Sequence, residues 1–114
     1  MKKDTVYLRH ILESIGRIEE NTADGREKFM MSHTLQDAVL RNLQPMSEST
    51  QRLSDDLKQK YPDIEWHSIA GFRNVLVHDY LGIDFDIVWR VVQNNVPELK
   101  RTASVMLNEM EKNE

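Results

Sequence analysis

Four side chains that can do chemistry lie within the eight residues 73–80. They are a permanent cation, an amide, an imidazole and a phenol: Arg73, Asn74, His78 and Tyr80. Their neighbours are mostly Val and Leu, so the stretch otherwise has the composition of a buried helix. Because polar groups are costly to bury without partners, four of them here indicate a site. An Arg beside a His can cleave a phosphodiester without a metal, since one stabilises phosphate charge and the other moves protons.

The spacing of these residues predicts two columns on a helix that turns about 100° per residue. Tyr80 lies over Arg73 two turns later, and Asn74 lies one turn from His78. Asn74 is therefore placed to hydrogen-bond one ring nitrogen of His78 and hold its tautomer. Arg73 and His78 are about 140° apart, so they reach one ligand only if another surface faces them. A second copy across a two-fold axis would provide it, and we expect a homodimer with a composite cleft.

The helix that carries this stretch is expected to begin at Ile64 or Glu65, after the break at 61–63. It is expected to end after Tyr80, because Gly82 follows in the position that commonly terminates helices. The face opposite the polar arc is predicted to pack into the core through Ile69, Phe72 and Leu76.

Length and composition point to one domain covering residues 1–114, with a modest core. The chain has 39% hydrophobic and 30% charged residues and no apolar run of about 20, which argues against a membrane protein. It has no cysteine and no apolar segment after Met1, so we expect a cytoplasmic protein without a disulfide or a Cys-based zinc site. Its net charge of -4 argues against a broad DNA-binding surface.

The remaining chain shows helical periodicity and no strand-like alternation. A first helix is expected over residues 4–21, with an apolar stripe of Val6, Ile11, Ile15 and Ile18 flanked by Leu8 and Leu12. Asp24 is predicted to cap a short second helix, with Glu27 in the capping-box position. The composition of 4 Gly and 3 Pro favours long helices. The fold class is therefore all-α: an antiparallel bundle of four to five helices.

Two prolines fall inside the apolar stripes of later helices. A third helix is expected to start near 32–34 and to continue, kinked, through Pro45 to Leu57. The last segment is capped by Asp84, and its apolar positions are Val88, Val92, Val96, Leu99, Ala103, Met106 and Met110. Asn95 before Pro97 looks like a fresh N-cap at which the helix restarts.

The other histidines, His10, His33 and His67, lie in different segments without metal-ligand spacing, and no metal or other cofactor is expected. Trp66 and Trp89 are interpreted as core or interface anchors.

The stretch 73–80 resembles the Arg-(four to six residues)-His motif of the HEPN superfamily, and its His-x-Tyr ending resembles the HepT-like family. The similarity extends over nearly the whole chain, in blocks at residues 7–15, 36–43, 61–66, 69–74, 88–89 and 96–100. One departure is Pro-Met-Ser-Glu-Ser at 45–49, where the family pattern has an apolar and small run. This departure bears on the straightness of the third helix.

The resemblance implies a HEPN-like helical bundle that dimerises and acts as the toxin of a type VII toxin–antitoxin pair. It implies a metal-independent endoribonuclease site at the dimer interface, with Arg73 and His78 as the catalytic pair and Asn74 as a supporting residue. The implied partner is an MntA-like nucleotidyltransferase antitoxin, which silences the toxin by transferring AMP from ATP to Tyr80. The implied substrate is RNA, either tRNA or mRNA.

Two other readings stay open at this point. The chain is then either a non-catalytic HEPN module that binds a nucleotide or a partner nucleotidyltransferase, or an interaction protein in which the polar arc sets dimer register. The sequence also leaves open whether His78 or a group of the second copy is the general base.

Overall fold

The computed structural model describes residues 2–69 and 82–112, which contain helices and no strand. In chain order these are α1 (Lys2–Thr22), α2 (Arg26–Met31), α3 (His33–Arg52) and α4 (Asp55–Gln59). Residues 66–69 are helical, and α6 (Phe85–Arg90), the π-helical turn η1 (Val91–Asn95) and α7 (Val96–Lys112) follow. The all-α prediction is confirmed for these residues, whereas the bundle's total helix number and the homodimer stay predictions. No helix in the described ranges is long and apolar enough to cross a membrane.

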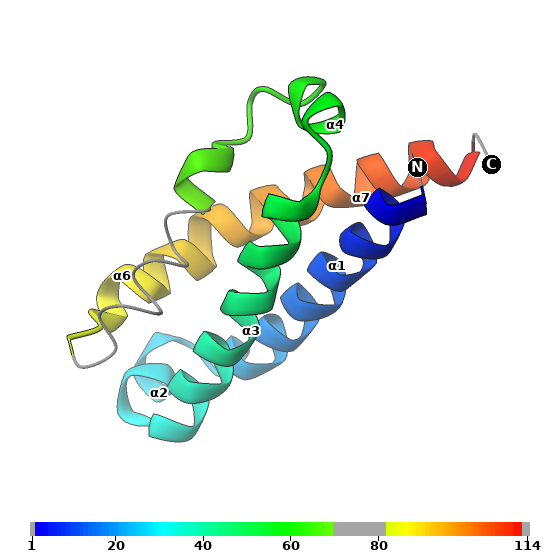
Figure 1. Cartoon of the computed structure of the whole chain (residues 1–114). Helices are drawn as coiled ribbons and strands as arrows, with labels where there is room; N and C mark the ends of the chain where they lie inside the picture. Colours follow the sequence, from blue (N-terminus) through cyan, green and yellow to red (C-terminus); the bar gives the residue numbers. More distant parts are fainter. Residues whose placement is uncertain (1, 70–81, 113–114) are drawn as a thin grey trace.

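Helix α1 packs against both α3 and α7 and runs antiparallel to each of them (Figure 1). Two ion pairs set its register on α7: Arg9 with Glu111 at 2.8 Å, and Glu19 with Lys100 at 3.0 Å. The two termini of the described chain therefore lie close together, at the same end of the molecule (Figure 1).

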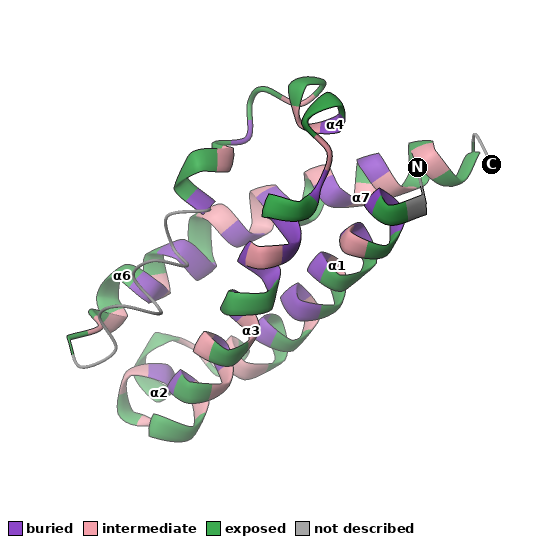
Figure 2. Ribbon diagram, viewed as in Figure 1, coloured by how far each residue is buried: buried purple, intermediate pink, exposed green. Residues whose placement is uncertain are grey.

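Buried residues lie on α1, α3 and α7, among other elements, and form one apolar cluster (Figure 2). One stripe of α1 is wholly buried and consists of Leu8, Ile11, Ile15 and Ile18. The prediction that Val6 leads this stripe was wrong, because Val6 is 46% exposed. Leu8 takes that place, since its three-residue step to Ile11 keeps the stripe in phase with the helix. The late helix contributes as predicted, through Val88, Val92, Val96, Leu99, Ala103 and Met106.

The predicted N-cap of α2, Asp24, was wrong. The N-cap residue of α2 is Gly25, with φ 96°, and no side chain caps the helix. Asp24 lies one residue too early, because the chain reverses through a conformation that glycine adopts far more readily than other residues. Phe29 anchors α2 in the core and is wholly buried.

Helix α3 runs unbroken through Pro45, but it ends at Arg52, so the prediction of one helix to Leu57 was wrong. The backbone N–H of Ser54 donates to Asp4 Oδ1 at 2.8 Å and is thereby lost to a continuing helix. The Ser54 hydroxyl donates to Asp4 Oδ2 at 2.7 Å and accepts from the N–H of Leu57, so Ser54 caps α4. A buried carboxylate on α1 therefore decides where α3 stops.

Residues 85–112 form one continuous helical run, so the predicted restart at Asn95 was also wrong. The run instead contains the π-helical turn η1, directly before Pro97. Within this turn the N–H of Val96 donates to the carbonyl of Val91, five residues back. The wider turn relieves the clash that a proline ring makes with the carbonyl four residues earlier. Asp84 caps the run as predicted, by accepting from the N–H of Asp86 at 2.9 Å.

The segment after α4 is tied to the far end of α7 by one side-chain hydrogen bond. The hydroxyl of Tyr61 donates to Glu109 Oε2 at 2.7 Å. This hydrogen bond, together with burial and the carboxylate charge, raises the pKa of Tyr61 above its usual value of 10.0.

The double role of Ser54 can be tested against a serine that only caps a helix. Ser54→Ala removes a cap and one hydrogen bond to buried Asp4, so we expect it to lower the free energy of unfolding by about 2 kcal/mol. Ser32 caps α3 by accepting from Leu35 N–H at 3.1 Å, and Ser32→Ala should cost about 1 kcal/mol. Urea denaturation followed by circular dichroism measures both. Equal losses in the two variants would contradict the role assigned to Asp4.

The tie between Tyr61 and Glu109 predicts an alkaline limit to stability. Because the pKa of Tyr61 is raised in the folded state, its contribution is complete below about pH 10 and is lost as pH rises above that value. The stability difference between wild type and Tyr61→Phe should therefore be constant from pH 7 to 9 and shrink above about pH 10. Thermal melts at pH 8 and 10.5 measure it. The control is Tyr7→Phe, and a Tyr61→Phe difference that grows with pH would refute the assignment.

Candidate functional site

The predicted site residues Arg73, Asn74, His78 and Tyr80 lie in 70–81, outside the described residues, as do the predicted core residues Phe72 and Leu76. The structure places the chain on either side of this segment. It therefore defines the framework that holds the segment: where the chain enters it, where it leaves, and which helices secure each end.

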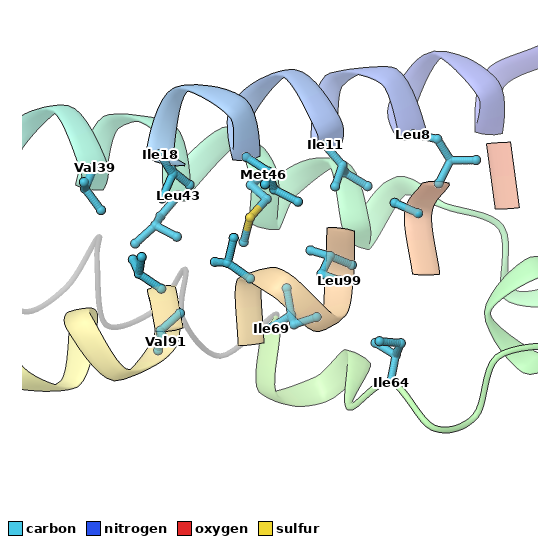
Figure 3. Packing of buried hydrophobic residues seen from close by; sticks show 14 of the residues in the cluster. Leu8, Ile11, Ile18, Val39, Leu43, Met46, Ile64, Ile69, Val91 and Leu99 are labelled. Carbon is cyan, nitrogen blue, oxygen red and sulfur yellow. The ribbon is translucent and has the colours of Figure 1, made fainter. Parts of the chain in front are cut away.

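The entry to the segment is a helix start held by polar contacts and two buried isoleucines. The backbone N–H of Ile69 donates to the carbonyl of Glu65 at 3.2 Å, which confirms the predicted start of this helix. The indole N–H of Trp66 donates to the carbonyl of Tyr61 at 3.2 Å, so the turn before the helix is closed. Ile64 and Ile69 are 5% and 4% exposed, and Ile69 joins the same apolar cluster as Leu99 (Figure 3). The predicted core role of Ile69 is confirmed.

The exit from the segment is held by aromatic packing. Phe85 meets Phe29 edge to face, with ring centroids 6.1 Å apart at 71°. Trp89 lies 5.3 Å from the same ring at a tilt of 36°. Such contacts contribute about 0.5–1.5 kcal/mol each beyond the apolar area they bury. The ion pair between Arg26 and Asp86 adds a second link between α2 and α6.

A hollow of about 680 Å³ opens beside the entry to the segment. The end of α3, helix α4 and residues 62–68 form its walls, with Lys58, Trp66 and His67 among the lining residues. The indole of Trp66 is partly buried and is fixed by its hydrogen bond to Tyr61, whereas His67 is exposed. Among the described residues, the hollow thus presents one imidazole and one ammonium group beside the entry to the segment.

The described ranges contain no group of three or more His, Cys, Asp or Glu residues arranged to hold a metal ion. His10, His33 and His67 are each exposed and lie in α1, at the start of α3 and beside α4.

Several framework contacts were not predicted from the sequence. The cap at Ser54 had a local signal, because a serine followed by two acidic residues is typical of a helix start. The hydrogen bond of Tyr61 to Glu109 had none, since its partners are 48 residues apart. The same holds for Arg26 and Asp86, which are 60 residues apart.

Comparison with known proteins gives this framework a family. The family model described as Ribonuclease HepT-like matches residues 11–106, a range that includes the whole 73–80 motif. No solved structure matches the chain significantly.

Three curated relatives illustrate the similarity. A Methanocaldococcus jannaschii protein named "Gamma-glutamylcyclotransferase and putative RNase" is 40% identical over 99% of the chain, which spans 52% of that relative's length. The "Probable ribonuclease HepT" of Thermococcus cleftensis is 36% identical over 82% of the chain and 86% of its own length. The "mRNA nuclease HepT" of Shewanella oneidensis is 29% identical over 84% of the chain and 90% of its own length.

These matches agree with the resemblance that the motif and its flanking blocks indicated. The chain belongs to the Ribonuclease HepT-like family of the HEPN superfamily.

Proposed function

We propose that this protein is a metal-independent endoribonuclease that acts as the toxin of a type VII toxin–antitoxin pair. The observation that carries the proposal is the family match over residues 11–106, which contains the complete Arg-x4-His-x-Tyr pattern. The name of the Shewanella oneidensis relative, mRNA nuclease HepT, favours mRNA over tRNA as the substrate class. No described residue is assigned to the chemistry itself.

The proposed reaction is an internal transfer at phosphorus. The 2′-oxygen of one nucleotide forms a bond to the adjacent phosphorus, and the bond from phosphorus to the 5′-oxygen of the next nucleotide breaks. The products are a 2′,3′-cyclic phosphate and a 5′-hydroxyl end. His78, or its counterpart in a second copy, takes the 2′-hydroxyl proton or delivers one to the leaving oxygen. Arg73 stabilises the charge that builds on the phosphate oxygens.

A homodimer is part of this proposal because one helix cannot bring the two groups together. With Arg73 and His78 about 140° apart on a helix, each needs a partner surface that faces it. Two copies related by a two-fold axis present the pair twice and allow one imidazole to act as base while the other acts as acid. Helical spacing would put Asn74 one turn before His78, where its proposed role is to fix the imidazole tautomer.

Tyr80 is proposed as the point at which the enzyme is switched off. The partner is an MntA-like nucleotidyltransferase, which catalyses attack of the tyrosine oxygen on the α-phosphorus of ATP. The phenolic proton is lost, the bond between the α- and β-phosphates breaks and pyrophosphate leaves. Because helical spacing would put Tyr80 two turns over Arg73, the attached AMP would place bulk and negative charge beside the phosphate-binding cation.

The catalytic assignment predicts that two side chains are indispensable and that two similar ones are not. We expect Arg73→Ala and His78→Ala each to reduce RNA cleavage by about 100-fold or more, in the presence of EDTA. His33→Ala and Arg101→Ala remove an exposed imidazole and an exposed guanidinium outside the motif, and should leave cleavage unchanged. A DNA strand of the same sequence should stay intact because it lacks the 2′-hydroxyl.

Light scattering of the wild type and both motif variants, coupled to gel filtration, reports whether they remain folded dimers. Cleavage that persists in both folded motif variants would refute the ribonuclease assignment. A folded wild-type dimer that binds nucleotide or its partner without cleaving RNA would instead make the chain a binding module.

The switch predicts a covalent change at one tyrosine. Incubation with the neighbouring nucleotidyltransferase and ATP should add one AMP per modified chain and abolish cleavage, as measured by intact mass and by RNA digestion. Tyr80→Phe should cleave RNA but gain no mass, whereas Tyr7→Phe should be modified like the wild type. An AMP-sized gain that survives in Tyr80→Phe would place the modification elsewhere.

A further inference from the structure

A second concave surface lies between α1 and α3, and the described residues that line it come from these two helices. It has a volume of about 310 Å³. Helix α1 contributes His10, Glu13, Ser14 and Arg17, and α3 contributes Arg41, Asn42, Pro45 and Ser49. We call this surface the α1–α3 groove.

The groove contains nearly buried polar groups without partners. Ser14 and Ser49 are each 7% exposed, and neither hydroxyl is hydrogen-bonded among the described residues. Asn42 donates its side-chain N–H to the carbonyl of Ala38 at 2.8 Å, which leaves its amide oxygen available as an acceptor. Neither hydroxyl oxygen is among the buried polar atoms without a partner in the described residues, so both open onto the groove, where they can bond water or a polar ligand.

The charge of the groove is positive although the whole chain has a net charge of -4. Its one carboxylate, Glu13, is already paired with Arg17 at 2.9 Å. Arg41 is exposed and forms no ion pair with any described residue. His10 adds an imidazole that donates to an anion when it is protonated. The groove therefore favours an anionic ligand.

Two more cations lie on the same helix faces beyond the groove, toward the start of α1 and the end of α3. Arg52 lies eleven residues after Arg41 on α3, which places it on the same face about 16 Å further along, with the carboxylate of Glu48 between them. Lys3 lies seven residues before His10 on α1, and so on the same face as that imidazole. Both side chains are exposed and have no ion-pair partner among the described residues. The hydrogen bonds of Asp4 to Ser54 show that this end of α1 meets this end of α3.

We propose that the α1–α3 groove binds the phosphodiester backbone of single-stranded RNA. The distance from Arg41 to Arg52 matches the rise of about five stacked nucleotides at 3.4 Å each. Packed helices lie about 8–10 Å apart, so the furrow between them follows one strand rather than a duplex. Guanidinium groups bind phosphate oxygens in pairs, and the serine hydroxyls add hydrogen bonds at the floor. This inference rests on the proposed function, because it assigns the groove to the substrate of that ribonuclease.

The test uses a 12-nucleotide 2′-O-methyl RNA with a fluorescent label. This probe has no free 2′-hydroxyl and cannot be cut by the proposed reaction, so binding is measured apart from cleavage. The groove variant is Arg41→Gln with Arg52→Gln. The control variant is Arg101→Gln with Lys112→Gln, which removes the same charge from exposed positions of α7. The two variants are matched, because Arg52 lies in the last turn of α3 and Lys112 in the last turn of α7. Fluorescence anisotropy over a range of salt concentrations gives the affinity of the full-length protein for the probe.

We expect the groove variant to bind about tenfold more weakly than wild type at low salt, and the control to stay within about twofold. The slope of log affinity against log salt is negative and should become less negative by about 1.4 in the groove variant, since each contact to a single strand contributes about −0.7. A groove variant that binds like the control, or a wild type that does not bind the probe, would overturn the proposal.

Two further results distinguish failure of the groove proposal from failure of the proposed ribonuclease activity. If wild type cleaves RNA but the groove variant binds the probe normally, the ribonuclease stands and the groove proposal is wrong. If the groove variant loses probe binding while wild type cleaves no RNA, the groove is supported and the proposed catalysis fails.

Labelled polyglutamate serves as a model for an acidic protein. Loss of polyglutamate binding without loss of RNA binding would assign the groove to a protein partner and overturn the proposal.

Discussion

The structure depends on one constraint: a single apolar stripe on α1 serves two neighbouring helices at once. Leu8, Ile11, Ile15 and Ile18 are completely buried, and α1 packs against both α3 and α7. Full burial of such a side chain contributes about 1.5–3 kcal/mol. Because α3 and α7 share this stripe, a change in the position of α1 alters both of their contacts. The antiparallel ion pairs to α7 and the hydrogen bonds of Asp4 to Ser54 hold α1 in one register relative to them.

The two flanks of the segment 70–81 take their positions from this arrangement by different physical means. Before the segment, Tyr61 is tied to α7 through Glu109, and Ile69 enters the apolar cluster. After it, Phe85 and Trp89 pack on Phe29, which α2 brings next to α6. The hydrogen bond on the first flank is directional, and the aromatic packing on the second excludes water. Each flank of the segment is therefore fixed to the helical framework. Reactive side chains need such support, because catalysis depends on positions held to about 0.5 Å.

The periodicity of the sequence predicted the features of the fold that depend on local helix geometry. The 3.6-residue pattern identified the late-helix stripe from Val88 to Met106 and the start of the helix at Glu65, and the flanking motif blocks identified the family. The errors occurred where distant residues decide. The carboxylate of Asp4 ends α3 from 50 residues away, and the π-helical turn before Pro97 keeps a helix continuous that local signals would divide. For the site, residue types and spacing named Arg73, Asn74, His78 and Tyr80, but the contacts that frame them, such as Tyr61 with Glu109, leave no trace in local sequence.

The polar residues buried in α1 and α3 make this pair of helices different from the rest of the core. Thr5, Ser14, Ser47 and Ser49 are each at most 7% exposed, and the hydroxyls of Thr5 and Ser47 have no hydrogen-bond partner among the described residues. A buried hydroxyl without a partner costs about 1–3 kcal/mol, and alanine would fill much of the same space without that cost. Small hydroxyl residues therefore do not serve stability here. Stability instead comes from the apolar stripe of α1, which Thr5 and Ser14 flank on opposite edges.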